Sequence, residues 1–399
     1  MQRKIEFSPP DITEAEITAV ADTMRSGWLT TGNKTKAFEK ALAESIGNEK
    51  AVCFNSATAG LELILRLLEI GVGDEVITTA YTYTATAAVI VHTGAKLVLC
   101  DTAKNSFEID YSALHGCITS RTKAIIGVDI GGVICDYNSL VEIAQQHKDK
   151  FHSSNEWLSA IGRIAIIADA AHSLGAVKGD KNSGQLADFS CFSFHAVKNL
   201  TTGEGGAVTW KNHMGWNNEA IYKAFMLLSL HGQDKDALAK TKQAAWEYDV
   251  ITTGYKYNMT DIAASIGLVQ LQRYPQLLQK RHKLISIYNE ALQTMPLKLM
   301  AHSGENFTSS GHLYMARLLG FNSSKRGEII KKMAENGIVT NVHYKPLPLL
   351  TAYKRLGFDI TDFPNSYAMY CNEITLPLHT MMSENDVLYV CDSLKGILL

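Results

Sequence analysis

Hydrophobic and polar positions along the chain form a regular succession of strand-like and helix-like stretches. Short apolar runs rich in β-branched residues end in polar residues, and stretches with apolar residues at helical spacing separate most of them. This alternation predicts an α/β fold with a mostly parallel sheet between helices, in which ligands bind at the carboxyl ends of the strands. The predicted strands are 51–54, 75–80, 96–101, 123–130, 164–171 and 189–194, and a helix is predicted over 61–70.

The flanking regions predict further helices and a second unit. We predict a large domain over residues 1–270, with an N-terminal helical segment, and a smaller α/β domain over residues 271–399. The polar stretch 147–162 is predicted to be an irregular surface insertion. The remaining predicted elements are helices at 14–24, 36–45, 261–292, 324–337 and 384–398 and strands at 313–321 and 338–344.

The composition is that of an ordinary globular protein, with 46% hydrophobic residues, 20% charged residues and a formal net charge of -2. No lysine and arginine stripe is present, so nucleic acid is not an expected partner. The N-terminus lacks an apolar signal segment and no run approaches the ~18 apolar residues that span a bilayer, so we expect a cytoplasmic protein with no membrane partner. The seven cysteines are scattered and never form a CxxC pair, which indicates neither a disulfide framework nor a metal site.

Lys198 lies in SFHAVKNLTTGEGG, directly after the predicted buried strand 189–194. Most lysines are solvated surface charges, and one lysine in a loop is weak evidence by itself. Its setting among Gly203, Gly205 and Gly206 favours partial desolvation, which lowers a lysine pKa and supplies the neutral amine that a Schiff base needs. Lys198 is therefore a candidate for binding a carbonyl cofactor.

Asp169 ends the strand-like run IAIIAD, is followed by small residues, and stands 29 residues before Lys198. Alone it reads most simply as a helix N-cap. Together, a strand-end carboxylate and a strand-end lysine meet at one edge of a parallel sheet. This is the pair that pyridoxal phosphate (PLP) requires, since the carboxylate keeps the pyridine nitrogen protonated and the lysine binds the aldehyde.

Other residues near these strand ends fit the same cofactor. The turn NSATAG offers the hydroxyls of Ser56 and Thr58 and the N–H groups of a helix N-terminus to a phosphate, and simple N-capping is compatible with that role. Ser193 could add a phosphate contact. Tyr83 could stack on the cofactor ring and His172 could bond its phenolic oxygen, although an aromatic core residue and a structural histidine are the ordinary alternatives.

Several long motifs follow one another along nearly the whole chain. With them the chain resembles the fold-type-I PLP enzymes, and specifically the DegT-like family of nucleotide-sugar aminotransferases. The resemblance implies a large domain with a mostly parallel, mixed seven-stranded sheet between helices, plus a smaller α/β C-terminal domain. The motifs are SGWLTTGNKTKAFEKALAE, NSATAGLEL, DEVITTAYTYTATA, IADAAHSLGA, SFHAVKNLTTGEGG, TTGYKYNMTDIAASIGLVQL, VHYKPLP and ITLPLHTMMSENDV.

The resemblance also implies a role for each matching residue. Lys198 would be the Schiff-base lysine, Asp169 the partner of the pyridinium nitrogen and His172 the contact to the phenolic oxygen. Tyr83 would stack on the ring. The phosphate would be held by Ser56, Ala57, Thr58 and Ser193.

Asn258 matches a position that reaches the phosphate from the neighbouring subunit, which implies a homodimer with two shared active sites. Without the family, a surface asparagine in a turn is the simpler interpretation. His343, together with Tyr344 and Thr30, would lie at the sugar. The run VDIGGVICD departs from the family, because many members carry a histidine-containing VHLYG-like run there, and it could reshape the pocket floor; the insertion at 147–162 is the second departure.

The implied reaction is a ping-pong transamination at C4 of a nucleotide-linked 4-keto-6-deoxyhexose. Glutamate is the expected donor, PLP cycles through pyridoxamine phosphate, and the 4-amino sugar would serve lipopolysaccharide or other polysaccharide biosynthesis. The chain resembles C4-aminating members in its motifs SFHxxKNxTTxEGG and YKYNxTDI. C3-aminating members tend to carry SFYPxKNLGxxGDGG and an arginine in place of Asn258. Lys198 argues against the dehydratase branch, in which a histidine replaces the lysine.

Four alternatives to this reaction stay open at the level of sequence. They are a C3-aminating enzyme, another fold-type-I PLP enzyme such as a lyase, a nicotinamide-dependent oxidoreductase and a non-catalytic protein on the same fold. The oxidoreductase is weakly supported, because no GxGxxG motif follows the first strand.

Overall fold

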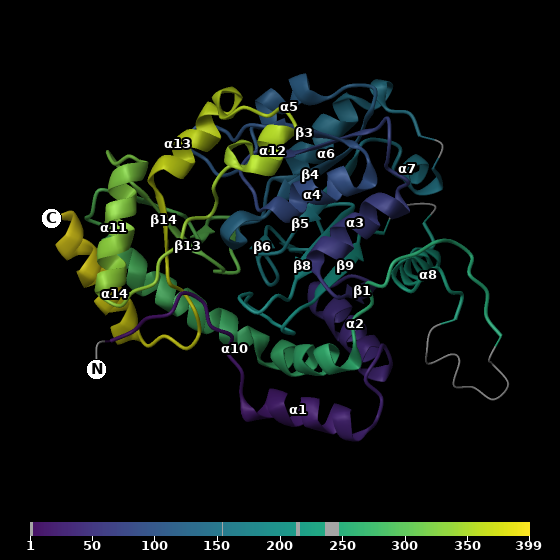
Figure 1. The fold of residues 1–399 in the computed structure, drawn as a ribbon, viewed down its shortest axis with the longest axis horizontal. Helices are drawn as coiled ribbons and strands as arrows, with labels where there is room; N and C mark the ends of the chain where they lie inside the picture. Colours follow the sequence, from purple (N-terminus) through teal and green to yellow (C-terminus); the bar gives the residue numbers. More distant parts are fainter. Residues whose placement is uncertain (1–2, 154, 213–215, 236–246) are drawn as a thin grey trace.

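The computed structural model describes residues 3–153, 155–212, 216–235 and 247–399. Its centre is a seven-stranded sheet in the order β1-β9-β8-β5-β4-β2-β3 (Figure 1). Strand β9 runs antiparallel to both of its neighbours, and the other neighbouring pairs are parallel. The predicted α/β fold with a mostly parallel mixed sheet is confirmed. The strands are β1 (Ala51–Phe54), β2 (Glu75–Thr79), β3 (Lys96–Cys100), β4 (Thr122–Val128), β5 (Ala165–Asp169), β8 (Phe189–Ser193) and β9 (Gly206–Trp210).

Helices cover both faces of this sheet, which explains why its strands are apolar along nearly their whole length (Figure 1). Phe38 and Leu140 belong to the buried cluster on one face, and Leu61, Ile64 and Phe225 belong to the cluster on the other. The helices of this part are α2 (Asn33–Ile46), α3 (Ala57–Leu67), α4 (Thr84–Thr93), α5 (Tyr111–Cys117), α6 (Tyr137–Gln146), α7 (Glu156–Ile161) and α8 (Asn218–Ser229), with short 3-10 turns at Ile130–Gly132 and Lys148–Lys150.

A smaller unit packs around a three-stranded sheet in the order β10-β13-β14. Its core contains Tyr288, Tyr314, Leu318 and Val390, all fully buried. The elements are β10 (Leu297–Leu299), β13 (Tyr314–Leu318), β14 (Glu373–Leu376), α11 (Ser323–Glu335), α12 (Thr351–Arg355), α13 (Pro364–Asn372) and α14 (Glu384–Leu398), with 3-10 turns at Leu347–Leu349 and Ile360–Asp362.

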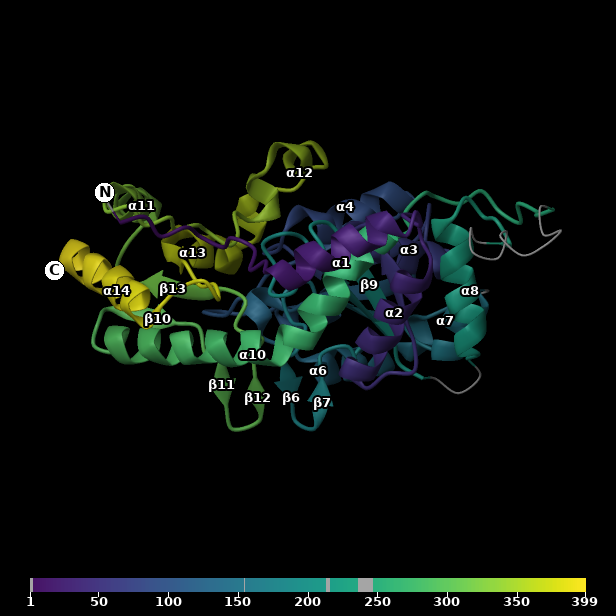
Figure 2. The ribbon, with the colours of Figure 1, turned by 90° about the horizontal axis from the view of Figure 1, so that it is seen from below.

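Helix α10 (Asp261–Leu292) joins the two parts as one continuous helix, as predicted (Figure 2). It packs against α1 (Glu14–Arg25) and α2 at one end and against α14 at the other. A second link is a four-stranded sheet in the order β11-β12-β6-β7, whose two hairpins come from different parts of the chain. The division at residue 270 falls inside α10 and stays a prediction. The hairpin strands are β6 (Val177–Lys178), β7 (Lys181–Asn182), β11 (Ser303–Gly304) and β12 (Phe307–Thr308).

The predicted strand at 338–344 is wrong. Within it only Ile338 and Asn341 form isolated bridges, and the strands that pair with β13 are β10 and β14. The ladder ends because the N–H of His343 donates to the Glu373 carboxylate at 2.9 Å instead of to a neighbouring strand. A side-chain acceptor of this kind leaves no trace in the hydrophobic pattern.

The predicted insertion at 147–162 is not irregular throughout, and residue 154 lies outside the described residues. Helix α7 begins after Asn155, whose side chain accepts the N–H groups of Trp157 and Leu158 at 3.0 Å each. Leu158 is buried in the core beside the central sheet. The prediction missed this helix because its apolar face is only one turn long.

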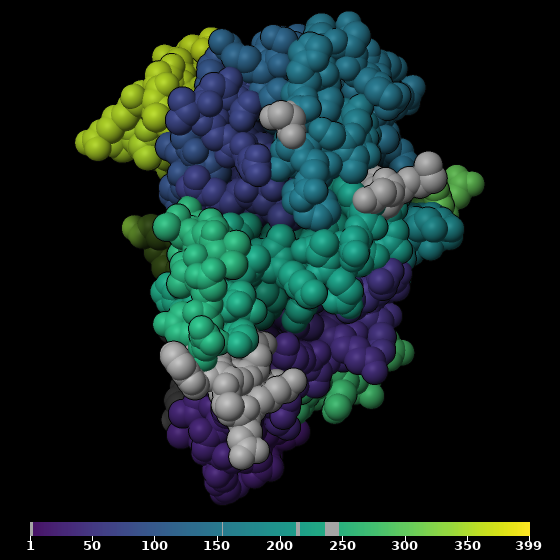
Figure 3. Space-filling model, turned by 90° about the vertical axis from the view of Figure 1, so that its right-hand side faces the viewer, coloured from purple at the N-terminus to yellow at the C-terminus, as the bar shows by residue number. Residues whose placement is uncertain are grey.

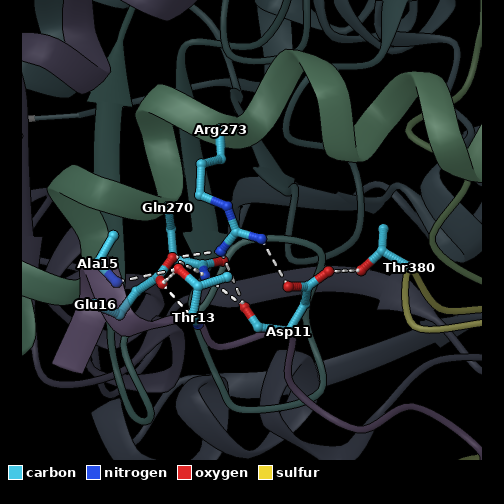
Figure 4. Close-up of polar contacts among 7 residues, drawn as sticks. All are labelled: Asp11, Thr13, Ala15, Glu16, Gln270, Arg273 and Thr380. Atoms are coloured by element: carbon cyan, nitrogen blue, oxygen red, sulfur yellow. Dashed lines mark hydrogen bonds and ion pairs between the residues drawn. The ribbon is translucent and has the colours of Figure 1, made fainter.

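The N-terminal segment is fastened to α10 by a network of charged and polar side chains (Figure 4). Arg273 donates to Asp11 Oδ1 at 2.7 Å and to Glu16 Oε1 at 2.6 Å, and Gln270 donates to the same Glu16 oxygen at 2.8 Å. On the other side, the hydroxyl of Thr380 donates to Asp11 Oδ2 at 2.6 Å. The network therefore ties three distant segments of the chain together.

Replacing Arg273 by methionine should lower the free energy of unfolding by about 2 kcal/mol, because it leaves the buried Glu16 carboxylate without a cation. Urea denaturation and hydrogen exchange of residues 3–16 would measure the loss. Lys40→Met, which removes an exposed ion pair on α2, should change stability by about 0.5 kcal/mol at most. Equal effects of the two substitutions would refute the role of the network.

The effect of Arg273→Met should also depend on pH. Burial raises the pKa of Asp11 and Glu16, but hydrogen bonds from Thr380, Thr13 and Arg273 outweigh burial and hold both pKa values below the ordinary 3.8 and 4.5. Groups whose pKa is lower in the folded state stabilise above their unfolded pKa and lose that contribution as pH falls. The difference between the wild type and Arg273→Met should therefore shrink below about pH 4.

Candidate active site

A cavity of about 440 Å³ lies at the carboxyl ends of the central strands, where a parallel sheet places ligands. Residues that follow β1, β2, β5 and β8 line it, and His343 and Tyr344, in the segment after Asn341, line it from the side of the smaller unit. Ten predicted site residues meet there although they are far apart in sequence: Ser56, Ala57, Thr58, Tyr83, Asp169, His172, Ser193, Lys198, His343 and Tyr344.

Lys198 is half-buried in the turn after β8, where its backbone N–H donates to the carbonyl of His195 at 2.9 Å. Burial lowers the pKa of its ammonium to about 8, and the charge of Asp169 offsets part of this effect. A lysine with this pKa has a substantial neutral fraction near physiological pH. It can act as a nucleophile toward an aldehyde or as a base.

Asp169 caps no helix, because turns follow it at residues 171–175. Its buried carboxylate accepts the Thr86 hydroxyl at 2.6 Å and the Ala171 N–H at 3.2 Å, which are both neutral donors. Burial raises the pKa of Asp169, and these bonds and the charge of Lys198 oppose the rise. No ion pair joins Asp169 to a cation within the described residues, so the carboxylate suits a cationic ring nitrogen.

The NSATAG turn forms the start of α3, four residues earlier than predicted, because Ser56 is its N-cap and accepts the Ala59 N–H at 3.1 Å. The first turn leaves the N–H groups of Ala57 and Thr58 without partners inside the helix. Strand β9 approaches closely here, since a Cβ on Gly206 would lie 2.4 Å from Ala57 N. Donors, hydroxyls and helix dipole together fit a phosphate.

His172 is buried, and its Nδ1 accepts the Gly131 N–H at 3.2 Å. The ring proton therefore sits on Nε2, which lies 3.1 Å from the hydroxyl of Tyr344. Burial holds the pKa of His172 well below its usual range, so the ring is neutral. Tyr83 is 58% exposed, with its ring centroid 5.8 Å from that of Tyr344, and its ring is accessible for stacking.

Asn258 and Thr30 are not part of this cavity. The Asn258 amide turns toward the N-terminal loop and donates to Thr31 Oγ1 at 2.6 Å, and the Asp261 N–H lies 3.2 Å from the Thr30 carbonyl. Figure 3 shows the side of the molecule on which the green residues near 250 lie above the purple N-terminal segment. Asn258 also forms an isolated antiparallel bridge with Phe54, so the two predicted residues lie close to each other on two separate segments beside the start of α3.

The sequence did not point to two polar groups of the site, the hydroxyl of Thr86 and the carboxyl of Asp129. Thr86, which orients Asp169, is three residues beyond Tyr83 in the same motif and could have been found from that spacing. Asp129 lies on the cavity wall within VDIGGVICD, where it accepts the Tyr137 hydroxyl at 2.7 Å and the Ser173 hydroxyl at 2.5 Å. Burial raises the pKa of Asp129 to about 7, so this departure places a second buried carboxyl near Asp169.

None of the described helices is long and apolar enough to cross a membrane.

The whole chain is similar to known aminotransferases. Residues 10–395 match the DegT/DnrJ/EryC1/StrS aminotransferase family. Spr1654 of Streptococcus pneumoniae, described as a sugar aminotransferase and solved in PLP, PMP and apo forms, is 51% identical, with a TM-score of 0.96 over 99% of this chain and 98% of its own.

Two more distant relatives also match nearly the whole chain. PseC of Helicobacter pylori, an aminotransferase of pseudoaminic acid biosynthesis, is 28% identical, with a TM-score of 0.88 over 99% of both chains. SpsC of Bacillus subtilis, a spore coat polysaccharide biosynthesis protein, is 35% identical over 397 residues, which is 98% of this chain and 97% of its own.

These matches confirm the predicted fold-type-I class, the PLP cofactor with its pyridoxamine form, and the assignment to the aminotransferases. They leave no support for the nicotinamide-dependent oxidoreductase. The chain belongs to the DegT/DnrJ/EryC1/StrS family of PLP-dependent sugar aminotransferases.

Proposed function

We propose that this protein transfers an amino group from glutamate to C4 of a nucleotide-linked 4-keto-6-deoxyhexose. The observation that carries the proposal is the meeting of Lys198 and Asp169 in one cavity with the N-terminus of α3. The position of amination rests on the SFHAVKNLTTGEGG motif and on Asn258 in YKYNMTDI. PseC acts in the biosynthesis of pseudoaminic acid and SpsC in that of spore coat polysaccharide, which favours polysaccharide biosynthesis as the destination of the product.

The residues divide the work of the reaction between them. PLP supplies an electron sink that stabilises negative charge on the carbon that loses or gains a proton. Lys198 would hold the cofactor through its aldehyde group and, once released, would carry the proton at the substrate carbon, as base in one direction and acid in the other. Asp169 would keep the ring nitrogen protonated, and the first turn of α3 would bind the phosphate through the N–H groups of Ala57 and Thr58.

The cavity wall adds orientation and specificity. Tyr83 would stack on the ring, and the Nε2–H of His172 would bond the phenolic oxygen in exchange for its contact with Tyr344. Ser56 and Ser193 would complete the phosphate site. His343, Tyr344 and Thr30 would contact the sugar. A cytoplasmic location is part of the proposal, since nucleotide sugars are made there.

We also propose a homodimer in which Asn258 and Thr30 complete the partner's active site. Their side of the chain carries exposed apolar residues that a monomer would leave in water, as at Leu29, Val250 and Ile251, the last of which is 60% exposed. A two-fold interface that buries this patch would carry the segment with Asn258 to the cavity of the other subunit.

Mixing two inactive variants tests the shared site. Lys198→Ala and Asn258→Ala homodimers should each have little activity. After subunit exchange, each heterodimer has one site with both lesions and one with neither, so about a quarter of wild-type activity should return. A mixture that stays as inactive as its components would show that Asn258 serves its own chain.

A substrate panel tests the function. With glutamate and PLP present, UDP-, dTDP- and GDP-linked 4-keto-6-deoxyhexoses are added singly, and 2-oxoglutarate release is followed. The proposal expects release that depends on one of these sugars. Release with none of them, or with ordinary 2-oxo acids only, would refute it.

A further inference from the structure

Four contacts fix His343 at the edge of the cavity, two through its backbone and two through its ring. Its backbone N–H donates to Glu373 Oε2 at 2.9 Å, and its carbonyl accepts the hydroxyl of Tyr81 at 2.9 Å. Ring atom Nδ1 lies 2.9 Å from Thr375 Oγ1, and Phe7 stacks on the ring with centroids 5.5 Å apart. These contacts fix the orientation of the imidazole, which lines the cavity.

Thr375 connects this ring to a carboxyl. Its hydroxyl lies 2.5 Å from Glu373 Oε1 as well as 2.9 Å from His343 Nδ1. The hydroxyl has one proton and can donate in only one direction. The direction determines which nitrogen of His343 carries the ring proton.

The other nitrogen, His343 Nε2, faces away from this chain of bonds. No described residue bonds to Nε2, and it is not among the buried polar atoms that lack a partner. It is therefore accessible from the cavity. Burial lowers the pKa of His343 to about 3, so the ring is neutral and Nε2 is either an N–H donor or a bare acceptor.

Glu373 is fully buried and forms no ion pair among the described residues. Arg326 of α11 is the charged group that faces it, but its guanidinium donates to the carbonyls of Tyr370 and Glu373 rather than to the carboxyl. Arg317, opposite Glu373 on β13, directs its guanidinium to Asn372 and Asn105.

Burial raises the pKa of Glu373 to about 8, against the lowering effects of Thr375, His343 and Arg326. The remaining titratable neighbours are neutral near this pH: burial raises the pKa of Tyr81 and of Tyr344 far above it. A buried carboxyl without a cation takes up a proton. Below about pH 8, Glu373 therefore donates to Thr375, and Thr375 donates to His343 Nδ1.

We propose that Glu373 and Thr375 are positioning residues that set the tautomer of His343, so that Nε2 presents an N–H donor to an oxygen of the sugar substrate. This inference rests on the proposed function. If Glu373 ionises, it accepts from Thr375, the ring proton moves to Nδ1, and Nε2 becomes an acceptor that repels the same oxygen.

Two substitutions separate this role from a merely structural one. Thr375→Val keeps the shape but breaks the chain of bonds, and it should raise KM for the sugar about tenfold while the reaction with glutamate is unchanged. Glu373→Gln donates from its amide as the protonated acid does, and should keep KM within about twofold of the wild type at pH 7.

Thr340→Val is the matched control, because the Thr340 hydroxyl has no partner within the described residues and belongs to the same segment as His343. It should leave KM unchanged. An increase as large as that of Thr375→Val would overturn the proposal.

The pH profile gives the sharpest comparison. In the wild type, KM for the sugar should rise about tenfold between pH 7 and pH 9 as Glu373 ionises, whereas in Glu373→Gln it should stay flat. Lys198 is common to both proteins, so its own titration cancels in the comparison. A parallel rise in both proteins would overturn the proposal.

The tautomer can be measured without any substrate. Nitrogen-15 NMR of histidine-labelled protein, with His343→Gln to assign the signal, should show the proton on Nε2 at pH 7 and on Nδ1 at pH 9. A proton on Nδ1 at pH 7 would overturn the proposal. Failure of the wild type to aminate any keto sugar would instead refute the proposed function, so the two failures are distinguishable.

Discussion

Lys198→Ala should lose about three to four orders of magnitude in transamination rate, because the proposed mechanism assigns to Lys198 the general base and acid at the reacting carbon. The visible absorption band of the cofactor bound through Lys198 should disappear as well. Both half-reactions should fail, since the same amine moves the proton in each direction.

Lys211→Ala is the matched control. Lys211 is an exposed lysine just beyond the end of β9, close in sequence but outside the cavity lining. This variant should keep full activity and the absorption band. If Lys198→Ala retained more than about a tenth of the wild-type rate, another group would have to be the base, and the account of the site would be wrong.

Asp169→Asn should lower kcat about 10²- to 10³-fold in both half-reactions. Asparagine keeps an acceptor for the Thr86 hydroxyl but carries no charge, so it cannot keep the ring nitrogen protonated. Stopped-flow measurement of the reaction with glutamate alone would show the loss without any sugar substrate.

Thr86→Val provides the comparison for Asp169→Asn. It removes the 2.6 Å hydrogen bond to Asp169 and leaves the carboxylate in place. A loss of about tenfold or less is expected, the value of one hydrogen bond. If Thr86→Val lowered kcat as much as Asp169→Asn, the orientation of the Asp169 side chain and not its charge would determine the rate.

Much of the fold could be predicted from the sequence because the central strands are buried on both faces and read as short apolar runs. Helix α10 was predicted for a similar reason, since its apolar spacing continues for 32 residues. The segment 338–344 is rich in β-branched residues and predicts a strand, whereas the backbone N–H groups of Val342 and His343 donate to side chains. The hydrophobic pattern contains no information about such bonds.

The site residues likewise divide into those that the sequence could predict and those that it could not. Asp169 ends β5 and Lys198 lies in the turn after β8, and both could be predicted because the parallel sheet brings the ends of its strands together. Asp129 could not be recognised, because its partners Tyr137 and Ser173 come from separate segments and meet only in the folded chain.

Two residues of the predicted site do not line the cavity of their own chain. Asn258 and Thr30 lie outside the cavity of their own chain, and only the family resemblance gave a reason to include them. Their role therefore depends on the subunit-mixing experiment.

The position of the new amine tests the central claim most directly. After reaction of the holoenzyme with glutamate and the accepted keto sugar, two-dimensional NMR of the purified nucleotide sugar identifies the carbon that bears nitrogen. The account predicts an amine at C4 of the 6-deoxyhexose. An amine at C3, or a sugar that returns without nitrogen, would contradict it.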